Sequence, residues 1–543
     1  MNLFSNPVIG DRFFARENEL SLLCRKVEDF KKGYRQNLAI LGKRQIGKSS
    51  LLLHFLSTLE GTDIIPIYID LSVLPFEAFI DQFIGMLLYN NFKDRKNETR
   101  DDLQLLIGMA SSNLPKTYKK IKAIYSDIKS GKEKSAFANL FDLPLCFSEE
   151  TGKFCLIALD NFRKLTDYNL KEPFSILGEK VMIQKMSLYI LLDYLTADSK
   201  NILSEKLSLL FGKFQVIELN PFTPQESLAF ISSRCRHHKL SAELKQFIAC
   251  FSNGEPFYLD VLMEYIVKKS DEKNILTISK EEFCRILSES ISDRFAPLNL
   301  YFSRIVESIS PPGNSKEAVK ILNAIIRKNK ITDIVEDSKC TRKQVYKLLE
   351  KFIMQDVVIK NGPLYAIEDE IFKIWLSLKE TEAAAQFKLG QKDHMDKLEN
   401  KIQQIIEGFR KEQERSLESK ILNLISAFDN EKVAVEEKIH ILPAFKHIRS
   451  KYINPEDFFL SAHGSKLWTF SVFKQVAGEN DVLNFINYCK SQNHKLGRKV
   501  LIILNGITPE AKLLAKEEHI WIWPLDKLNS LLNLYRKPKM AAL

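Results

Sequence analysis

The sequence predicts an α/β fold in which a parallel sheet carries a phosphate-binding loop. The first observation is the spacing GxxxxGKS over residues 42–49, which follows an apolar run at 38–41 and precedes a helical pattern. The second is the alternation of apolar runs with helical segments, which is typical of parallel strands covered by helices. The runs expected to form the other strands are 64–70, 154–159, 187–192 and 215–219.

The loop indicates how a nucleotide would be held. Backbone N–H groups of the loop and of the following helix N-terminus would converge on the phosphates. Lys48 would reach the β and γ oxygens, and the hydroxyl of Ser49 would bind Mg²⁺. ATP with Mg²⁺ is therefore the expected ligand. The other loop positions expected to contact it are Gly42, Arg44, Gln45, Ile46, Gly47 and Ser50.

The end of a later strand supplies a candidate metal ligand. The run 154–159 ends in Asp160, and an acid at the carboxyl edge of a parallel strand can hold the Mg²⁺ water shell. Asp160 is therefore the Walker B candidate, with Ser49 as its companion in metal binding. A different register remains open, in which Glu149, Glu150 or Asp167 takes this role.

Length and composition limit the class of protein. A chain of 543 residues is too long for one core and predicts three or four domains. Its eight cysteines include no CxxC pair, which favours reduced thiols in a cytoplasmic protein. No apolar run reaches the ~18 residues of a membrane span and the first residues lack a signal-peptide pattern, so no membrane partner is expected. The formal charge of +10 permits nucleic-acid binding without requiring it.

Three motifs in this order resemble a known family. They are the box FFARENEL at 13–20, the loop with Arg44 in a GxRxxGK spacing, and GEP at 254–256. Over roughly residues 10–380 the chain resembles the archaeal-type ATPases of the STAND branch of AAA+ P-loop NTPases, which are related to the Orc/Cdc6 initiators. The resemblance implies that the box, with Arg16, flanks the adenine and that Pro256 belongs to a helical lid. It also implies a basic residue after the fourth strand, here Lys213.

One position departs from the family pattern. The family carries an acidic residue directly after the Walker B aspartate, where it polarises the attacking water, and this chain has Asn161. An amide can orient a water but cannot accept its proton. ATP hydrolysis is therefore expected to be slow, or to take its base from elsewhere, such as Asp193 at the end of the fourth strand.

Residues 297–380 are predicted to form a winged helix, because three helical patterns precede two short strands joined by an Asn-Gly-Pro turn. The helical patterns lie at 318–326, 332–335 and 341–349. The basic residues expected on the exposed side of the third helix are Arg342, Lys343, Lys347 and Lys351. A recognition helix would meet DNA phosphates there. Related domains also hold a nucleotide core closed, so both roles remain open.

The last two segments differ in composition. Residues 381–430 are rich in Glu, Lys, Gln and Ala and predict a long amphipathic helix or coiled coil, acting as a spacer or dimer seam. Residues 431–543 hold 17 Lys and Arg against 11 Asp and Glu, and their order of elements resembles restriction-endonuclease-like domains. Those nucleases bind Mg²⁺ through an Asp and an ExK pair, but here Val472 precedes Lys474 and Gly464 begins a turn where the Asp is expected. The domain is therefore expected to bind DNA without cutting it.

Together these inferences predict a P-loop core at 1–225, a helical lid at 226–296, a winged helix at 297–380, a helical linker at 381–430 and a degenerate nuclease-like α/β domain at 431–543. The expected function is an ATP-binding, slowly hydrolysing switch. It would couple the ATP or ADP state to homo-oligomerisation, to double-stranded DNA binding, or to both. Two alternatives are a DNA-binding adaptor that holds ATP as a structural ligand and an ATP-gated nuclease effector.

Overall fold

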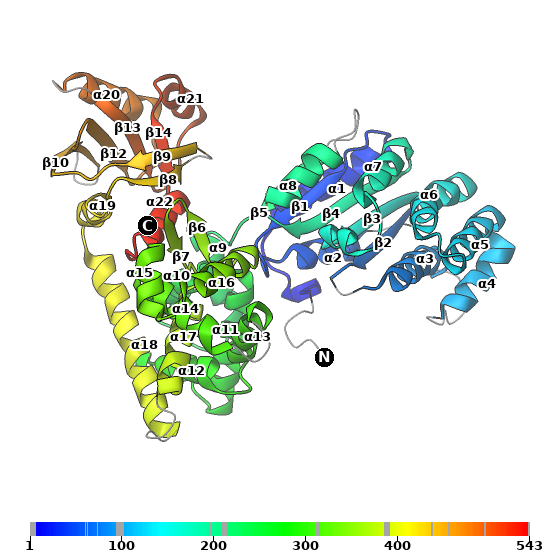
Figure 1. Ribbon diagram of the computed structural model, residues 1–543, viewed down its shortest axis with the longest axis horizontal. Coiled ribbons are helices and arrows are strands. Elements are labelled where there is room, and N and C mark those ends of the chain that lie inside the picture. Colours follow the sequence, from blue (N-terminus) through cyan, green and yellow to red (C-terminus); the bar gives the residue numbers. More distant parts are fainter. Residues whose placement is uncertain are drawn as a thin grey trace. The chain divides into compact units, whose positions relative to one another are not determined.

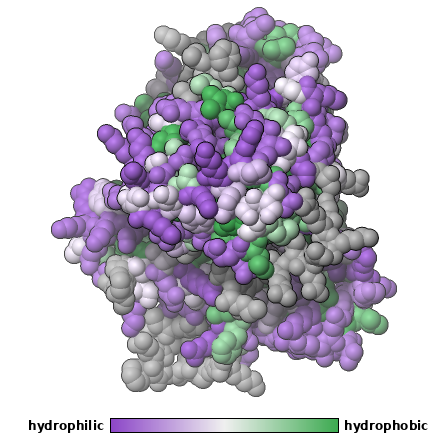
Figure 2. Space-filling view, turned by 90° about the vertical axis from the view of Figure 1, so that its right-hand side faces the viewer, coloured by the Kyte–Doolittle hydropathy of each residue, from purple (hydrophilic) through white to green (hydrophobic). Residues whose placement is uncertain are grey.

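The computed structural model describes residues 7–59, 61, 63–72, 74–93, 102–195, 197–207, 214–310, 315–384, 391–435, 438–453, 457–492 and 496–540. The chain divides into two compact units, Met1–Pro221 (unit 1) and Phe222–Leu543 (unit 2) (Figure 1). Within the described ranges, no helix combines the length and the apolar character needed to cross a membrane. The face of the molecule seen in Figure 2 is predominantly hydrophilic, and its apolar residues form small separate patches.

Unit 1 contains a five-stranded parallel sheet in the order β2-β3-β4-β1-β5, which confirms the predicted α/β core. The strands are β1 Leu38–Gly42, β2 Ile64–Asp70, β3 Phe154–Asp160, β4 Ser187–Tyr194 and β5 Gln215–Leu219. Alternate residues of β1 divide between two apolar clusters, with Leu38 and Ile40 in one and Ala39 and Leu41 in the other. The central strands are therefore apolar along their length, because both faces of the sheet are covered.

Helices cover the two faces of this sheet (Figure 1). The helices are α1 Glu17–Lys31, α2 Lys48–Thr58, α3 Phe76–Phe92, α4 Leu103–Asn113, α5 Pro115–Lys129, α6 Glu133–Thr151, α7 Pro173–Ile183 and α8 Ala197–Asn201, with short helical turns η1 Gly10–Arg12, η2 Phe162–Asp167 and η3 Ile202–Lys206. α1 and α2 share an apolar cluster with one face, and α3, α6 and α7 share one with the other. α4 and α5 belong to the second cluster, in the long connection between β2 and β3.

Unit 2 begins with five helices, where the lid and the start of the winged helix are predicted. They are α9 Pro224–Arg234, α10 Ala242–Phe251, α11 Pro256–Glu272, α12 Lys280–Ser292 and α13 Pro297–Ile309. Pro256, expected to mark a lid corner, is the first residue of α11. Its missing N–H costs nothing at this position, and its restricted φ favours the start of a helix.

Three helices and a hairpin follow, in the order predicted for the winged helix. They are α14 Ser315–Arg327, α15 Ile331–Ser338, α16 Arg342–Met354 and the antiparallel strands β6 Ile359–Asn361 and β7 Leu364–Ala366, followed by α17 Glu370–Ala384. α16 begins with a capping box, in which Thr341 accepts from the Gln344 backbone and Gln344 bonds back to Thr341. The basic helix therefore starts at a position that the local sequence specifies.

The predicted linker contains the long helix α18 Gln391–Glu414, which packs against the rest of unit 2. It buries Leu398, Ile402 and Ile406 within the chain. Its Phe409 ring packs edge-on against Phe247 of α10 at 5.6 Å between ring centroids. The apolar stripe that suggested a dimer seam thus packs against helices of the same unit.

The C-terminal part of unit 2 is a mixed five-stranded sheet in the order β10-β11-β12-β13-β14. The elements are α19 Leu417–Ile425, the hairpin β8 Glu431–Val435 and β9 Lys438–Leu442, β10 His447–Tyr452, β11 Phe458–His463, β12 Leu467–Phe473, α20 Glu479–Lys490, β13 Leu496–Ile503, α21 Pro509–Glu517, β14 Trp521–Pro524 and α22 Leu525–Leu534. β10 to β12 are antiparallel, and β12 to β14 are parallel. Leu364 and Ala366 of β7 share the apolar cluster of this sheet, so the hairpin and the C-terminal part have a common core.

Candidate nucleotide site

The phosphate loop connects β1 to α2 through a turn that only a glycine allows at its first position. A Cβ added at Gly42 would lie 2.8 Å from Ile46 Cγ2 and 2.9 Å from the Leu219 carbonyl oxygen. Ile46 is itself buried in the cluster beneath α1 and α2, while Arg44 at the loop tip is exposed. The close contact of Gly42 with Ile46 holds the loop against the sheet, so that its remaining N–H groups surround the start of α2.

Lys48 opens α2 and is 7% exposed. Its Nζ donates to the carbonyl oxygens of Gly42 at 3.1 Å and Lys43 at 2.8 Å, and it lies 4.8 Å from the centre of the Tyr194 ring. The ammonium therefore lies inside the loop, among acceptors that a phosphate could replace. This is the placement that the sequence predicts for the cation facing the β and γ phosphates.

Ser49 and Asp160 meet at the carboxyl edge of the sheet, although they lie 111 positions apart along the chain. The Ser49 hydroxyl donates to the Asp160 carboxylate, and the Tyr68 hydroxyl donates to the same carboxylate at 2.9 Å. Asp160 is 3% exposed, and burial raises its pKa above the ordinary value. A hydroxyl and a carboxylate are oxygen ligands of the kind Mg²⁺ prefers, and a cation would offset the cost of burying this charge.

Two of the three alternative acids, Glu150 and Asp167, are engaged with other partners. Glu150 accepts the backbone N–H groups of Lys116 and Thr117 at the start of α5. Asp167 forms an exposed ion pair with Lys164 at 2.7 Å. Because each carboxylate is engaged away from the phosphate loop, Asp160 is the acid that the fold brings to Ser49.

Asn161 faces a carboxylate that the sequence analysis did not single out. Its backbone is left-handed, with φ of 57°, and its Nδ2 donates to Asp70 Oδ1 at 2.8 Å. Asp70 closes β2 and lies opposite Asp160 in the pairing of β2 with β3. The signal that could have found it is the same as for Asp160, namely an aspartate that ends an apolar parallel strand.

Asp193, the alternative base that the sequence suggests, is buried and held by several partners. Its side chain is 2% exposed and pairs with Arg163, with 3.2 Å between Arg163 Nε and Asp193 Oδ1. The backbone N–H groups of Arg163 and Tyr194 donate to the same carboxylate at 2.9 and 2.7 Å. One cation and two backbone N–H groups therefore hold the Asp193 carboxylate in place. Lys213, the other catalytic candidate beyond this strand, lies outside the described residues.

Arg16 supports the loop from behind. It precedes α1 with φ of 75°, and one of its guanidinium nitrogens donates to the carbonyl oxygens of Asn220 at 2.7 Å and Ile46 at 3.4 Å. The side chain is buried, so it connects the loop to the segment after β5. Pro256 belongs to unit 2, at the start of α11.

The segment before α1 lies along α2. Phe13 stacks on His54 with 4.1 Å between the ring centroids, and the Ser50 hydroxyl accepts the Val8 backbone N–H at 3.0 Å. The Gly10 N–H donates to His54 Nδ1 at 3.3 Å. The box expected to flank the adenine is thus held next to the phosphate loop by α2, and Ser50 contributes to holding it.

A second group of candidate residues lies on α16 in unit 2. Arg342, Lys343 and Lys347 are exposed, whereas Lys351 is half-buried. Val345, Leu348 and Phe352 are buried on the opposite side. The helix therefore presents three cations to solvent, as expected for contact with phosphates.

The hairpin beside this helix is covered at its turn. Asn361 Nδ2 donates to the Ala434 carbonyl oxygen at 3.2 Å, and the Ala434 N–H donates back to Asn361 Oδ1 at 2.6 Å. A Cβ added at Gly362 would lie 1.7 Å from the carbonyl oxygen of Lys432, so β8 passes directly over the turn. A wing that enters a DNA groove needs a free tip, and this tip contacts β8.

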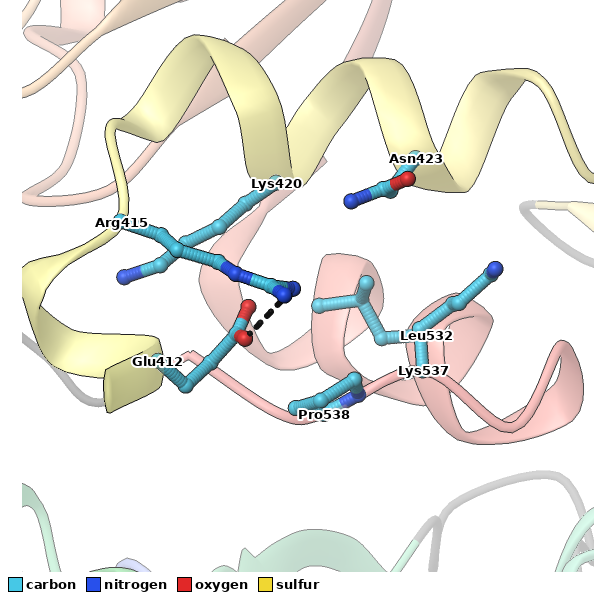
Figure 3. A pocket seen from close by; sticks show the side chains of 7 residues that line it. All are labelled: Glu412, Arg415, Lys420, Asn423, Leu532, Lys537 and Pro538. Carbon is cyan, nitrogen blue, oxygen red and sulfur yellow. Dashed lines mark ion pairs between the residues drawn. The ribbon is translucent and has the colours of Figure 1, made fainter. Parts of the chain in front are cut away.

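A basic pocket of about 290 Å³ lies between the end of α18, α19 and the chain after α22 (Figure 3). Arg415, Lys420 and Lys537 contribute its positive charge, and Arg415 pairs with Glu412 at 3.0 Å. Burial lowers the pKa of Lys420, and the nearby Lys474 and Arg415 lower it further against the opposing effect of Glu412. An anion in this pocket would relieve the repulsion between the cations.

The nuclease-like positions of the C-terminal sheet lack a second carboxylate. Val472 of β12 is 0% exposed and packs in the apolar cluster. The Lys474 N–H donates to Asp457 Oδ1 at 3.1 Å, so an aspartate is present at the start of β11 and not near Gly464, where the sequence analysis sought it. Among the described residues, no group of three or more His, Cys, Asp or Glu side chains is placed to hold a metal.

Comparison with known proteins finds similarity in structure. No protein-family model and no curated protein sequence matches the chain. It is similar to a Walker-type ATPase of Pyrococcus abyssi, with 19% sequence identity, coverage of 69% of this chain and 98% of that chain, and a TM-score of 0.44. The ORC2 protein of Aeropyrum pernix, in ADPNP and ADP complexes, has 11% sequence identity and a TM-score of 0.42. That similarity covers 70% of this chain and 98% of ORC2. Cdc6p from Pyrobaculum aerophilum has 14% sequence identity and a TM-score of 0.34, with coverage of 69% of this chain and 97% of Cdc6p.

These identities and TM-scores are too low for a function to be transferred, so the chain's own geometry has to support one. In unit 1, a parallel sheet carries a phosphate loop after β1. An aspartate at the end of β3 lies beside the serine of that loop. Unit 1 therefore has the α/β fold of a P-loop NTPase.

Proposed function

We propose that this chain binds ATP with Mg²⁺ in unit 1 and hydrolyses it slowly, as a switch related to the archaeal-type STAND ATPases. The observation that carries the proposal is the contact between Ser49 and Asp160 at the sheet edge, with the Lys48 ammonium inside the same loop. Lys48 and Ser49 come from the start of α2 and Asp160 from the end of β3, and together they match the needs of a nucleoside triphosphate and its metal.

The residues of this chain would act as follows. Lys48 would exchange its bonds with loop carbonyl oxygens for bonds to the β and γ phosphates. Ser49 and Asp160 would hold Mg²⁺, which neutralises charge developing on the phosphates. Tyr68 would keep the Asp160 carboxylate oriented through its hydroxyl. Because Asn161 cannot accept a proton, its position contributes no base directly.

Replacing Lys48 with alanine tests the binding step. Removal of one charge-assisted contact should weaken ATP affinity about 10- to 100-fold, corresponding to about 1.5–3 kcal/mol. Lys31→Ala is the matched control, because Lys31 forms a surface ion pair with Asp63 at 3.2 Å. Isothermal titration with ATP and Mg²⁺ measures both variants. Equal affinity of Lys48→Ala and the parent chain would contradict the proposal.

The switch itself requires that nucleotide state changes assembly. Native mass spectrometry with ADP, with a non-hydrolysable ATP analogue and with added duplex DNA would detect a change in the number of copies. Tight retention of ATP without turnover, and without a change in mass, would instead favour an adaptor that holds ATP as a structural ligand.

Contact with double-stranded DNA is a second proposed function, carried by unit 2. Its support is the row of three exposed cations on α16 together with the basic pocket around Lys420. Because β8 covers the hairpin turn, the proposed DNA contact uses α16 and the basic pocket. These residues would contact the phosphates, and the hairpin would not enter a DNA groove.

A further inference from the structure

Three adjacent strands of unit 1 end in carboxylates with different surroundings. Asp160 at the end of β3 accepts from Ser49 and Tyr68, and Asp193 near the end of β4 is buried against Arg163. Asp70 at the end of β2 is exposed. The first carboxylate is suited to a metal and the second is neutralised by a cation. Asp70 combines a position next to the metal-binding strand with access to water.

The orientation of Asp70 is set by hydrogen bonds from two residues. Asn161 Nδ2 donates to Oδ1 at 2.8 Å, and the Ser72 N–H donates to the same oxygen at 2.9 Å. The Ser72 hydroxyl donates to Oδ2 at 3.0 Å. Asp70 and Asp160 are register partners on adjacent strands, which lie about 4.8 Å apart, so the two aspartates end neighbouring strands at the same edge of the sheet.

We propose that Asp70 is the base for ATP hydrolysis and that Asn161 positions it; this rests on the proposed function. A water oxygen forms a bond to the γ-phosphorus while the bond from that phosphorus to the β–γ bridging oxygen breaks. ADP leaves with that oxygen, the γ-phosphoryl group becomes inorganic phosphate, and the water proton passes to the Asp70 carboxylate. Asn161 directly follows Asp160, and its amide orients the acid of the neighbouring strand.

Asp70→Asn tests the catalytic role at constant shape. The amide keeps an oxygen that can accept from Asn161 but cannot take a proton, so kcat should fall about 100-fold or more while ATP affinity changes less than about threefold. Asp63→Asn is the matched control, since Asp63 is an exposed aspartate just before the same strand. It should hydrolyse ATP like the parent chain.

The outcomes separate this inference from the proposed function. A parent chain that binds no ATP would refute the proposed function, and with it the premise of the inference. An Asp70→Asn variant with parental kcat would overturn the role of Asp70 alone. A parent chain that binds ATP but never turns it over would overturn both that role and the proposed slow hydrolysis. An equal loss in Asp63→Asn would show a general effect of charge at β2, and would also overturn it.

Asn161→Gly tests the positioning role. Glycine tolerates the left-handed backbone at this position and removes the amide that contacts Asp70. We expect kcat to fall about 10-fold with KM unchanged, and the double variant to be no slower than Asp70→Asn alone. Asn161→Glu tests the alternative that the base belongs at position 161. If this variant raises turnover, and the gain remains when Asp70→Asn is added, the inference is wrong.

Discussion

The two α/β sheets of this protein each place an aspartate near a lysine at a sheet edge, and among the described residues only the unit 1 edge adds a hydroxyl to its carboxylate. In unit 1, Asp160 shares its carboxylate with the Ser49 hydroxyl, and Lys48 lies in the same loop. In unit 2, Asp457 accepts the Lys474 N–H, but the neighbouring position on β12 is the apolar Val472.

The difference shows that a strand end becomes a cation site only when the neighbouring element adds a second oxygen. The phosphate loop adds Ser49 to Asp160 because β1 and β3 both flank β4. β12 adds a side chain that packs into the core instead. At the unit 2 edge, Lys474 lies beside Asp457, and the described residues of β12 add no second carboxylate there.

The largest effect is expected from removing the two aspartates in turn. Asp160→Asn should lower ATP turnover about 10²- to 10³-fold, because it removes a charged metal ligand from the site. Asp457→Asn should leave ATP turnover unchanged, and neither chain should cleave duplex DNA with Mg²⁺. Steady-state phosphate release and a plasmid-nicking assay measure the pair. Mg²⁺-dependent cleavage that Asp457→Asn abolishes would erase the contrast between the edges.

A somewhat smaller effect is expected from Val472→Glu, which supplies the missing carboxylate to unit 2. The side chain is 0% exposed, so a buried charge there should lower the free energy of unfolding by about 3 kcal/mol. All four tryptophans lie in unit 2, so their fluorescence during urea unfolding reports this unit. Val476→Glu, at a position 57% exposed, should cost less than about 0.5 kcal/mol. Equal stability of both variants would mean that the edge could accept a metal ligand after all.

The smallest effect concerns the basic surface of α16. The logarithm of DNA affinity falls linearly with the logarithm of salt concentration. The double variant Lys343→Ala/Lys347→Ala should reduce the slope of this line by about 1.8, because two phosphate contacts are lost. Lys116→Ala with Lys119→Ala removes the same charge from α5 of unit 1 and should leave the slope unchanged. Fluorescence anisotropy with a labelled duplex measures both. A slope that is equal in the parent and both variants would assign α16 to protein contacts.

Much of unit 1 could be predicted because its signals are local. The five strands appear as apolar runs, and the loop spacing identifies Lys48 and Ser49. The three helices between β2 and β3 are harder to predict, since 83 residues without a motif separate the two strands. Whether the stripe of α18 joins two chains or one could not be decided either, because an apolar face does not specify which surface covers it.

The sequence by itself determined the phosphate loop, the order of strands and helices, and an aspartate at the end of β3, because spacing and periodicity act over a few residues. The tertiary structure decided which strand ends become neighbours. Only the pairing of β2 with β3 brings Asp70 to Asn161, 91 positions away along the chain. The same long-range contacts hold Asp193 against Arg163 and place β8 over the Gly362 turn. Those partners depend on strand order and packing, which no local pattern specifies.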